Sequence, residues 1–358
     1  MRSSPLFPPP PRSFRGRQRD LATLAALIQT HHPAKIALVG AGGSGKSTLA
    51  AALGHKLRSR FEGRVHWFRI GAWDPRTLAA MMATRFGRSA HGEAALRAVR
   101  RVLMESGPSM VVLDNHEDDG ATATLLDAMR DTPVSWVITA RRSLLSGVTV
   151  FPVVPPLVNA GKSPFPRLND ITRLLRWNPV ALDLADALVE TGVTSVPELA
   201  SFLVDRGVER VRPVDHEDDL PEVALLVERG FRASPPAARR MLGVLAHMGG
   251  DHMDTESLAI LSKAGKSAGS ALARLVALRL VQEPVRGRFT LHATVRHAVW
   301  KRTKPTPDAL FEHYITLLEK EPDRLDLEQT HLFAAMDHAQ IKGSLDMILR
   351  VNRITEET

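Results

Sequence analysis

Apolar positions in the first 153 residues follow two alternating patterns, short continuous runs and runs with helical spacing. Continuous apolar runs rich in β-branched residues are typical of strands buried on both faces of a parallel sheet. Five stretches are predicted as strands, at 36–39, 64–70, 110–113, 134–138 and 148–153. Three stretches between them are predicted as helices, at 49–57, 75–86 and 92–105. This alternation predicts an α/β domain of three layers, with a parallel sheet between two layers of helices.

From about residue 167 the apolar spacing becomes helical for most of the remaining chain. Pro179 is placed to open a helix, because the first helical position needs no backbone N–H donor. Three further helices are predicted at 237–247, 255–262 and 267–278. A hairpin of 280–283 against 288–291 follows them, with its turn at 285–287. Helices followed by a hairpin predict a winged-helix domain, and amphipathic helices within 306–350 predict the start of an α-helical repeat region.

Residues 40–47 fit the pattern G-x-x-x-x-G-K-[ST] at every fixed position, between a predicted strand and a predicted helix. In that context Lys46 would reach the β- and γ-phosphates, Ser47 would bind Mg²⁺, and Thr48 would touch the α- or β-phosphate. Backbone N–H groups of the loop would form a concave nest for phosphate oxygens, aided by the helix dipole. The nest residues are Gly40, Gly42, Gly43, Ser44 and Gly45. The loop therefore predicts a site for ATP or ADP with Mg²⁺.

Polar residues also follow two other predicted strands. Asp114 ends the 110–113 run, which is the Walker B pattern of an acid that holds Mg²⁺ through its water shell. Asn115 stands where many such ATPases carry a second acid that polarises water, and Glu117 is the candidate substitute. Arg141 follows the 134–138 run and is predicted to sense the γ-phosphate. The reason is that this strand is expected between the strand that precedes the phosphate loop and the strand that ends at Asp114. With Lys46, these residues predict a slow ATPase.

Composition limits the class of protein, the location and the partners that this sequence is compatible with. The 358 residues are 44% hydrophobic and 24% charged, as is typical of a soluble globular protein with two to four domains. There is no cysteine, which excludes disulfides and thiolate metal sites and fits a cytoplasmic location. Neither a membrane-span-length apolar run nor a signal-peptide core is present. The formal net charge of +8 allows a nucleic-acid partner without favouring one.

Six motifs in one order resemble the STAND class of signalling NTPases, in the NB-ARC architecture of apoptosome and plant-resistance proteins and their bacterial relatives. The resemblance extends from Phe14 to about Arg302. The motifs are FRGRQRDLATL at 14–24, GAGGSGKST at 40–48, VVLDNHED at 111–118, TARR at 139–142, WNPVALDLA at 177–185, and LHA at 291–293 within the predicted winged helix.

The resemblance implies further nucleotide contacts. The opening motif would place Phe14, Gly16 and Arg17 near the bound nucleotide. Pro179 would lie against the adenine ring, and His292 would bond the β-phosphate of ADP and lock the winged helix onto the nucleotide domain. Two positions depart from the family pattern. Asn178 replaces a glycine, and Ala293 replaces an acid.

The predicted organisation has five parts. Charged and proline-punctuated sequence at 208–222 marks a linker. The parts are a flexible proline-rich tail at 1–13, a P-loop domain at 14–158, a helical domain at 159–225, a winged-helix domain at 226–303 and a helical, TPR-like region from 304 to 358.

The resemblance implies a molecular switch for signalling or defence. ADP would lock a closed state, and ATP would favour an open state that associates head to tail into a ring. No effector domain precedes Phe14 and the helical array stops early, so a fragment of a larger protein is expected, with its activating ligand bound by a C-terminal sensor that it lacks.

Two alternatives concern DNA. One is an ATP-dependent AAA+ protein that binds DNA through the winged helix, and the other is a STAND-type transcription regulator. The basic stretch 286–304 favours a DNA-binding role, whereas the predicted helix 267–278 carries only Arg274, too few basic residues for a helix that reads a groove.

Overall fold

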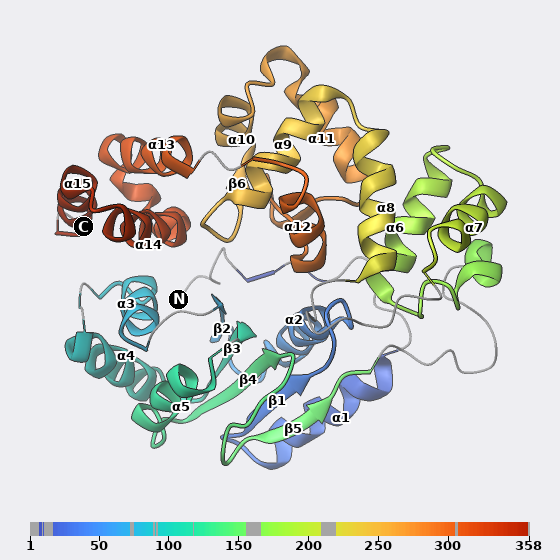
Figure 1. Ribbon diagram of the computed structural model, residues 1–358. Helices are drawn as coiled ribbons and strands as arrows, with labels where there is room; N and C mark the ends of the chain where they lie inside the picture. Colours follow the sequence, from blue (N-terminus) through green and yellow to red (C-terminus); the bar gives the residue numbers. More distant parts are fainter. Residues whose placement is uncertain are drawn as a thin grey trace. The chain divides into compact units, whose positions relative to one another are not determined.

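The computed structural model describes residues 7, 8, 10, 17–71, 75–88, 90, 92–116, 118–154, 166–208, 220–304 and 307–356. These residues form two compact units. The first unit comprises the described parts of Met1–Gly40, Lys46–Val153 and Phe311–Thr358, and the second comprises those of Ala41–Gly45 and Val154–Leu310 (Figure 1). No helix of the described residues is long and apolar enough to span a membrane.

The first unit contains a five-stranded sheet in which all neighbouring strands are parallel. Its strands are β1 Lys35–Val39, β2 Val65–Gly71, β3 Ser109–His116, β4 Val134–Ala140 and β5 Thr149–Pro152. Their order is β2-β3-β4-β1-β5, so β4 lies between the strand that precedes the phosphate loop and the strand that carries Asp114. The five predicted strands and the parallel sheet are confirmed, and so is the central position of the 134–138 strand.

Two helical layers cover this sheet, because successive side chains of a strand point to opposite faces. In β3, Met110 and Val112 pack against one layer, and Val111 and Leu113 against the other. The first layer consists of α1 Gln18–Thr30 and α2 Lys46–Leu57. The second consists of α3 Pro75–Arg85, α4 Gly92–Ser106 and α5 Asp119–Ala128.

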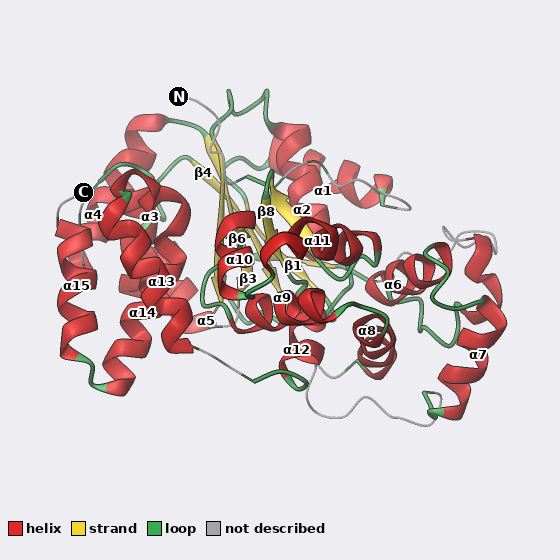
Figure 2. Ribbon diagram, turned by 90° about the horizontal axis from the view of Figure 1, so that it is seen from above, coloured by secondary structure: helices red, strands yellow, loops and turns green. Residues whose placement is uncertain are grey.

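Three C-terminal helices complete the first unit. They are α13 Pro307–Lys320, which enters the unit at Phe311, α14 Leu325–Lys342 and α15 Leu345–Glu356. α14 lies beside α3 (Figures 1 and 2). Phe333 packs against the core formed by α3–α5. In the amide orientation of Gln329 that satisfies both side chains, its oxygen accepts from Arg85 Nε and Nη2 at 3.1 and 3.0 Å. The sequence did not predict that these helices would pack onto the sheet-bearing part.

The second unit is mainly helical and has a small antiparallel sheet. Its helices are α6 Pro179–Glu190, α7 Val196–Asp205, α8 Pro221–Arg232, α9 Pro236–His247, α10 Thr255–Leu261, α11 Ala268–Ala277 and α12 Ala293–Trp300. Its strands are β6 Met253–Asp254, β7 Gln282–Val285 and β8 Arg288–Thr290, in the order β6-β8-β7. The predicted hairpin is present, with β7 two residues later than predicted. α8 crosses the predicted domain boundary at residue 225 and contacts both α6 and α12.

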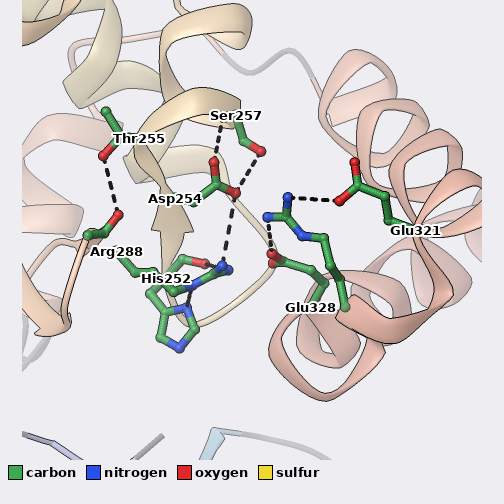
Figure 3. A network of polar contacts seen from close by, with 9 residues as sticks. His252, Asp254, Thr255, Ser257, Arg288, Glu321 and Glu328 are labelled. Atoms are coloured by element: carbon green, nitrogen blue, oxygen red, sulfur yellow. Dashed lines mark hydrogen bonds and ion pairs between the residues drawn. The ribbon is translucent and has the colours of Figure 1, made fainter. Parts of the chain in front are cut away.

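A buried arginine organises the small sheet (Figure 3). Arg288 is 5% exposed, and its Nε donates to His252 Nδ1 at 2.8 Å. Its Nη1 lies 3.9 Å from Asp254 Oδ2, and Asp254 also caps α10 by accepting from the N–H of Ser257. A buried guanidinium must be paired to be tolerated. This network therefore fixes β8 against the start of α10.

A second ionic cluster joins α11 to α6. Arg279 follows α11 and donates to Asp183, Asp186 and Glu190 of α6 at 2.9, 3.1 and 2.8 Å. Its backbone has φ +53°, in the left-handed region that costs a non-glycine residue energy. The three ion pairs offset that cost.

Candidate functional site

The phosphate loop leaves β1 beside β4, since Gly40 N–H donates to Ala140 O at 3.2 Å. Gly43 and Gly45 have φ +73° and +90°, backbone conformations that favour glycine. These positive φ values allow successive N–H groups to turn towards one anion. Lys46 begins α2, and its Nζ donates to Gly40 O at 2.8 Å across the base of the loop. The backbone at Gly43 and Gly45 therefore has the conformations that a phosphate-binding loop needs.

One carboxylate oxygen joins three elements at the carboxyl end of the sheet. Asp114 Oδ1 on β3 accepts from Ser47 Oγ at the start of α2 and from Thr139 Oγ1 on β4, each at 2.6 Å. Asp114 and Thr139 are buried, whereas Ser47 is exposed. The structure thus brings together Ser47 and Asp114, which the sequence predicted as the Mg²⁺ residues.

The backbone after Asp114 explains the residue that follows it. Asn115 has φ +62°, and the pairing of β3 with β4 is irregular between Leu113 and His116. Asparagine tolerates the left-handed region better than most residues. Its N–H donates to Thr139 Oγ1 at 2.9 Å, so Thr139 accepts from residue 115 while it donates to Asp114. The bulge thereby fixes the direction of the Thr139 hydroxyl.

The next residue of β3 connects the strand to two neighbouring segments. His116 is buried, with Nε2 2.7 Å from Asp119 Oδ1 and Nδ1 2.8 Å from Thr122 Oγ1. Asp119 Oδ2 also accepts from Leu144 N–H at 3.0 Å. Burial raises the pKa of the Asp119 carboxyl, but these hydrogen bonds and the charges of His116 and Arg142 outweigh it and hold that pKa below its ordinary value. An ionised Asp119 therefore holds the segment that follows Arg141.

In the second unit, the first turn of α6 contacts the phosphate loop. Asn178 Oδ1 caps α6 by accepting from Val180 N–H and Ala181 N–H at 2.9 and 3.1 Å. Asn178 Nδ2 donates to Gly42 O at 3.5 Å. Pro179 is the first residue of α6, as predicted. Asn178 thus provides both a helix cap and a contact to the loop.

His292 lies at the N-cap position of α12, also in the second unit. Its Nδ1 accepts from Thr294 N–H at 3.3 Å and lies 2.8 Å from Thr294 Oγ1. A backbone N–H can only donate, so Nδ1 carries no proton and the neutral ring has its N–H at Nε2. In this tautomer the Nε2–H of His292 can donate a hydrogen bond to a phosphate oxygen.

The remaining predicted residues are placed as follows. Arg17 is buried at the start of α1 and pairs with Asp20 at 3.0 Å, rather than lying in an open loop. Arg141 follows β4 and is half-buried, and Thr48 is exposed on α2. Phe14, Gly16 and Glu117 lie outside the described residues.

Two polar residues at this site make contacts that the sequence predictions did not specify. Thr139 and Ser135 are the two hydroxyl residues in the buried, mostly apolar strand Val134–Ala140. A buried hydroxyl in a strand needs a hydrogen-bond partner. Asn178 precedes a proline and an apolar helical run, which is the pattern of a helix N-cap. Both signals are present in the sequence, but neither identifies the partner residue.

The donor set fits a phosphate-bound magnesium ion. Within the described ranges, no group of three or more His, Cys, Asp or Glu side chains is placed to hold a metal ion. Mg²⁺ in nucleotide sites takes only one or two protein oxygens and completes its shell with water and phosphate oxygens. Ser47 Oγ and Asp114 Oδ1, 2.6 Å apart, match that requirement.

The sequence matches no protein-family model and no curated protein. Among solved structures, the chain is similar to a Signal Transduction ATPase with Numerous Domains (STAND) protein with a tetratricopeptide repeat sensor from Pyrococcus horikoshii. That likeness has a TM-score of 0.57 and 14% identity, and covers 98% of this chain and 59% of that chain. It shows that the two proteins share a fold, and that this chain spans 59% of the length of the STAND protein.

Two weaker likenesses are to a Cdc6 protein and an Orc1 protein. Cdc6p from Pyrobaculum aerophilum has a TM-score of 0.35 and 14% identity, over 85% of this chain and 99% of that chain. Orc1 of Aeropyrum pernix, solved in complex with DNA, has a TM-score of 0.33 and 18% identity, over 84% and 96%. Likenesses of this strength carry no argument about this chain. The parallel sheet with its helical layers, the glycine loop after β1 and the likeness to the STAND protein together fit an α/β P-loop NTPase fold.

Proposed function

We propose that this chain binds ATP or ADP with Mg²⁺ and works as a nucleotide-dependent switch of the STAND type. The observation that carries the proposal is the bonding of Ser47 and Thr139 to one oxygen of Asp114, directly behind the phosphate loop. Three elements distant in sequence converge there on one carboxylate. Sheet packing alone does not require a buried carboxyl group in contact with two hydroxyls.

In this proposal each residue of the site has a separate task. The N–H groups around Gly43 and Gly45 bind phosphate oxygens, and Lys46 neutralises the charge of the β- and γ-phosphates. Ser47 and Asp114 hold Mg²⁺, which when bound supplies the positive charge that bridges these phosphates. Thr139 keeps the Asp114 carboxylate oriented.

We expect hydrolysis to be slow. The strand position after Asp114 carries Asn115, whose amide cannot accept a proton from water as a second acid would. In this proposal Arg141, which follows β4, would read the γ-phosphate and so distinguish ATP from ADP without rapid turnover. A nucleotide site of this kind reports which nucleotide is bound.

The switch itself would depend on the second unit. Pro179 at the start of α6 would lie against adenine, and the Nε2–H of His292 would donate to the β-phosphate of ADP. Contacts made only in the closed state stabilise that state by the differential affinity they provide. Exchange for ATP would favour an open state that associates head to tail into a ring.

The parts of the second unit support this organisation. Helices α9, α10 and α11 precede the hairpin of β7 and β8, the order expected of a winged helix in the predicted domain 226–303.

We further propose that α13–α15 begin a helical sensor region that receives the activating ligand. The P. horikoshii protein is described as having a tetratricopeptide repeat sensor.

The test is the nucleotide content of protein purified without added nucleotide. The protein is denatured and the supernatant is chromatographed. Near-stoichiometric ADP is expected in the wild type and none in Lys46→Ala. Lys56→Ala is the matched control, because it removes an exposed lysine from the far end of the same helix.

A DNA-dependent ATPase would give the opposite result. Its site would be empty after purification, and its turnover would rise on addition of duplex DNA. α11 carries Arg274 as its only basic residue within Ala268–Ala277, so we do not prefer this function. An empty site with DNA-stimulated turnover would overturn the switch proposal.

A further inference from the structure

The proline-rich tail contacts the helix that follows the phosphate loop. The ring of Phe7 packs edge-on against His55 of α2 and against Trp67 of β2, with ring centroids 5.1 and 5.6 Å apart. Both pairs are nearly perpendicular, at 86°. Perpendicular aromatic pairs at these distances are favourable beyond the apolar area they bury. All three contacting segments belong to the first unit.

A glycine makes room for this ring. Gly54 lies inside α2, where glycine destabilises a helix relative to alanine. A Cβ built on Gly54 would clash with Phe7 Cζ and would lie 3.1 Å from Phe7 Cε2. The same Cβ would lie 3.2 Å from Val65 Cγ1. The Phe7 ring therefore lies directly against the α2 backbone at Gly54. We call the site formed by Gly54, His55 and Trp67 the socket.

A polar contact holds the next tail residue. His55 Nε2 lies 2.7 Å from Pro8 O, and because a carbonyl oxygen only accepts, His55 must donate. Proline has no N–H that would need a partner, and proline-rich segments are extended before they bind. The site offers a socket for an aromatic ring and, at His55, a hydrogen-bond donor for a carbonyl oxygen. It therefore suits an aromatic residue followed by proline.

We propose that Gly54, His55 and Trp67 form a docking site for an aromatic–proline peptide, and that Phe7–Pro8 of the tail is its resident and displaceable ligand. The occupant is this chain's own N-terminal segment, and the site recognises the ring of Phe7 and the carbonyl of Pro8. The proposal does not depend on nucleotide binding. It concerns the face of α2 near its C-terminal end, away from Lys46.

The absence of cysteine makes the docked tail directly measurable. Pro10 is exposed and is replaced in Pro10→Cys, which is then labelled with a dye that tryptophan quenches on contact. In the 358-residue chain the dye is expected to be quenched, and quenching is expected to be lost in Phe7→Ala. Trp67→Phe keeps an aromatic ring but removes the quencher, and it should also lose quenching.

Filling the socket tests the role of Gly54. Gly54→Leu is expected to expel Phe7 and abolish quenching, whereas Gly269→Ala should leave it unchanged, since nothing lies within 4 Å of a Cβ at Gly269 of α11. Thermal melts identify a Gly54 variant that fails to fold, and Phe7→Ala then decides the question alone. Quenching that persists in Phe7→Ala would overturn the proposal.

Binding in trans tests the peptide specificity. The Phe7→Ala variant of the 358-residue chain leaves the socket empty, and a fluorescent peptide of residues 4–12 is titrated into it. Polarisation should rise, but not with a peptide that carries Ala in place of Phe7 and not with Phe7→Ala combined with Gly54→Leu. The tethered tail has an effective concentration of about 1 mM. No binding at that peptide concentration would contradict the proposed recognition.

Discussion

Asn178 and Gly43 are in contact, so that a Cβ added to Gly43 would lie 3.0 Å from Asn178 Oδ1 and 3.2 Å from its Nδ2. The loop conformation at Gly43 and the cap of α6 are therefore fitted to each other. Any change in one of them must be accommodated by the other. Asn178 stabilises the start of α6, and Gly43 belongs to the predicted anion-binding loop. The stability of the helix and the binding of an anion therefore both depend on this contact.

Asn178→Ala should weaken both properties. Loss of the N-cap should destabilise α6 by about 1 kcal/mol, and loss of the contact to Gly42 should weaken ADP binding several-fold. The measurements are thermal unfolding and calorimetric titration with ADP. Ser195→Ala is the matched control because Ser195 caps α7 in a capping box away from the loop. It should lose similar stability and keep its ADP affinity; equal affinity losses in both would contradict the assignment.

Thr139→Val should weaken magnesium-dependent binding. The change removes a hydroxyl that donates to Asp114 and accepts from Asn115, at a cost in stability of about 1–3 kcal/mol. Nucleotide affinity should fall about tenfold with Mg²⁺, equivalent to ~1.4 kcal/mol, and much less with EDTA. Titrations with and without Mg²⁺ measure the difference.

The control for this change is Thr132→Val. Thr132 is also buried, and its hydroxyl donates to Met129 O at 2.6 Å. That variant should lose stability without any magnesium-dependent change in affinity. If Thr139→Val and Thr132→Val behaved alike with Mg²⁺, Thr139 would have no role at the nucleotide site.

His66 should make the stability of the protein depend on pH. Burial, with the nearby Arg85 charge, lowers the pKa of His66 to about 4 in the folded protein. Between about pH 6.5 and 4 the unfolded chain therefore binds a proton that the folded chain does not. Stability conferred by neutral His66 is complete above that range and is lost as the pH falls, by about 2 kcal/mol between pH 7 and 5.

Urea unfolding of His66→Gln at both pH values checks this expectation. The variant should lose about 2 kcal/mol less than the wild type on acidification. His31→Gln removes an exposed histidine and should follow the wild type. An unchanged pH dependence in His66→Gln would show that another group is responsible.

Arg279→Met should destabilise the second unit. The change leaves Asp183, Asp186 and Glu190 close together on α6 without their shared cation, at a cost of about 1–2 kcal/mol. The loss should shrink at high salt, since the acids are then screened from one another. Arg100→Met breaks an exposed pair with Asp131 and should cost under about 0.5 kcal/mol. Denaturant unfolding at two salt concentrations compares the two.

Local signals were enough to predict most of the first unit. The strand before Gly40 and the strand before Asp114 are continuous apolar runs, and such runs occur where both sheet faces are covered. The phosphate loop was predictable because its function depends on backbone conformations that restrict the residue type at Gly43 and Gly45. These features need no knowledge of distant contacts.

Features that depend on distant contacts were not predictable in the same way. The sequence does not show that Thr139 would meet Asp114, because this depends on the order of strands in the sheet. The proline-punctuated sequence before residue 223 indicated a linker, yet α8 begins at Pro221. Proline at the first helical position is compatible with either interpretation. Nor does an amphipathic helix specify its partner, as the packing of α14 on α3 illustrates.

The packing of Phe333 on the α3–α5 core has a consequence for biosynthesis. Ribosomes release the chain from its N-terminus, at about 5–20 residues per second, so residues 154–310 emerge over a period on the order of ten seconds. During that interval the sheet and α3–α5 are already outside the exit tunnel, whereas α14 has not yet emerged. In the nascent chain the apolar side of the α3–α5 core that Phe333 contacts is therefore uncovered until α14 emerges.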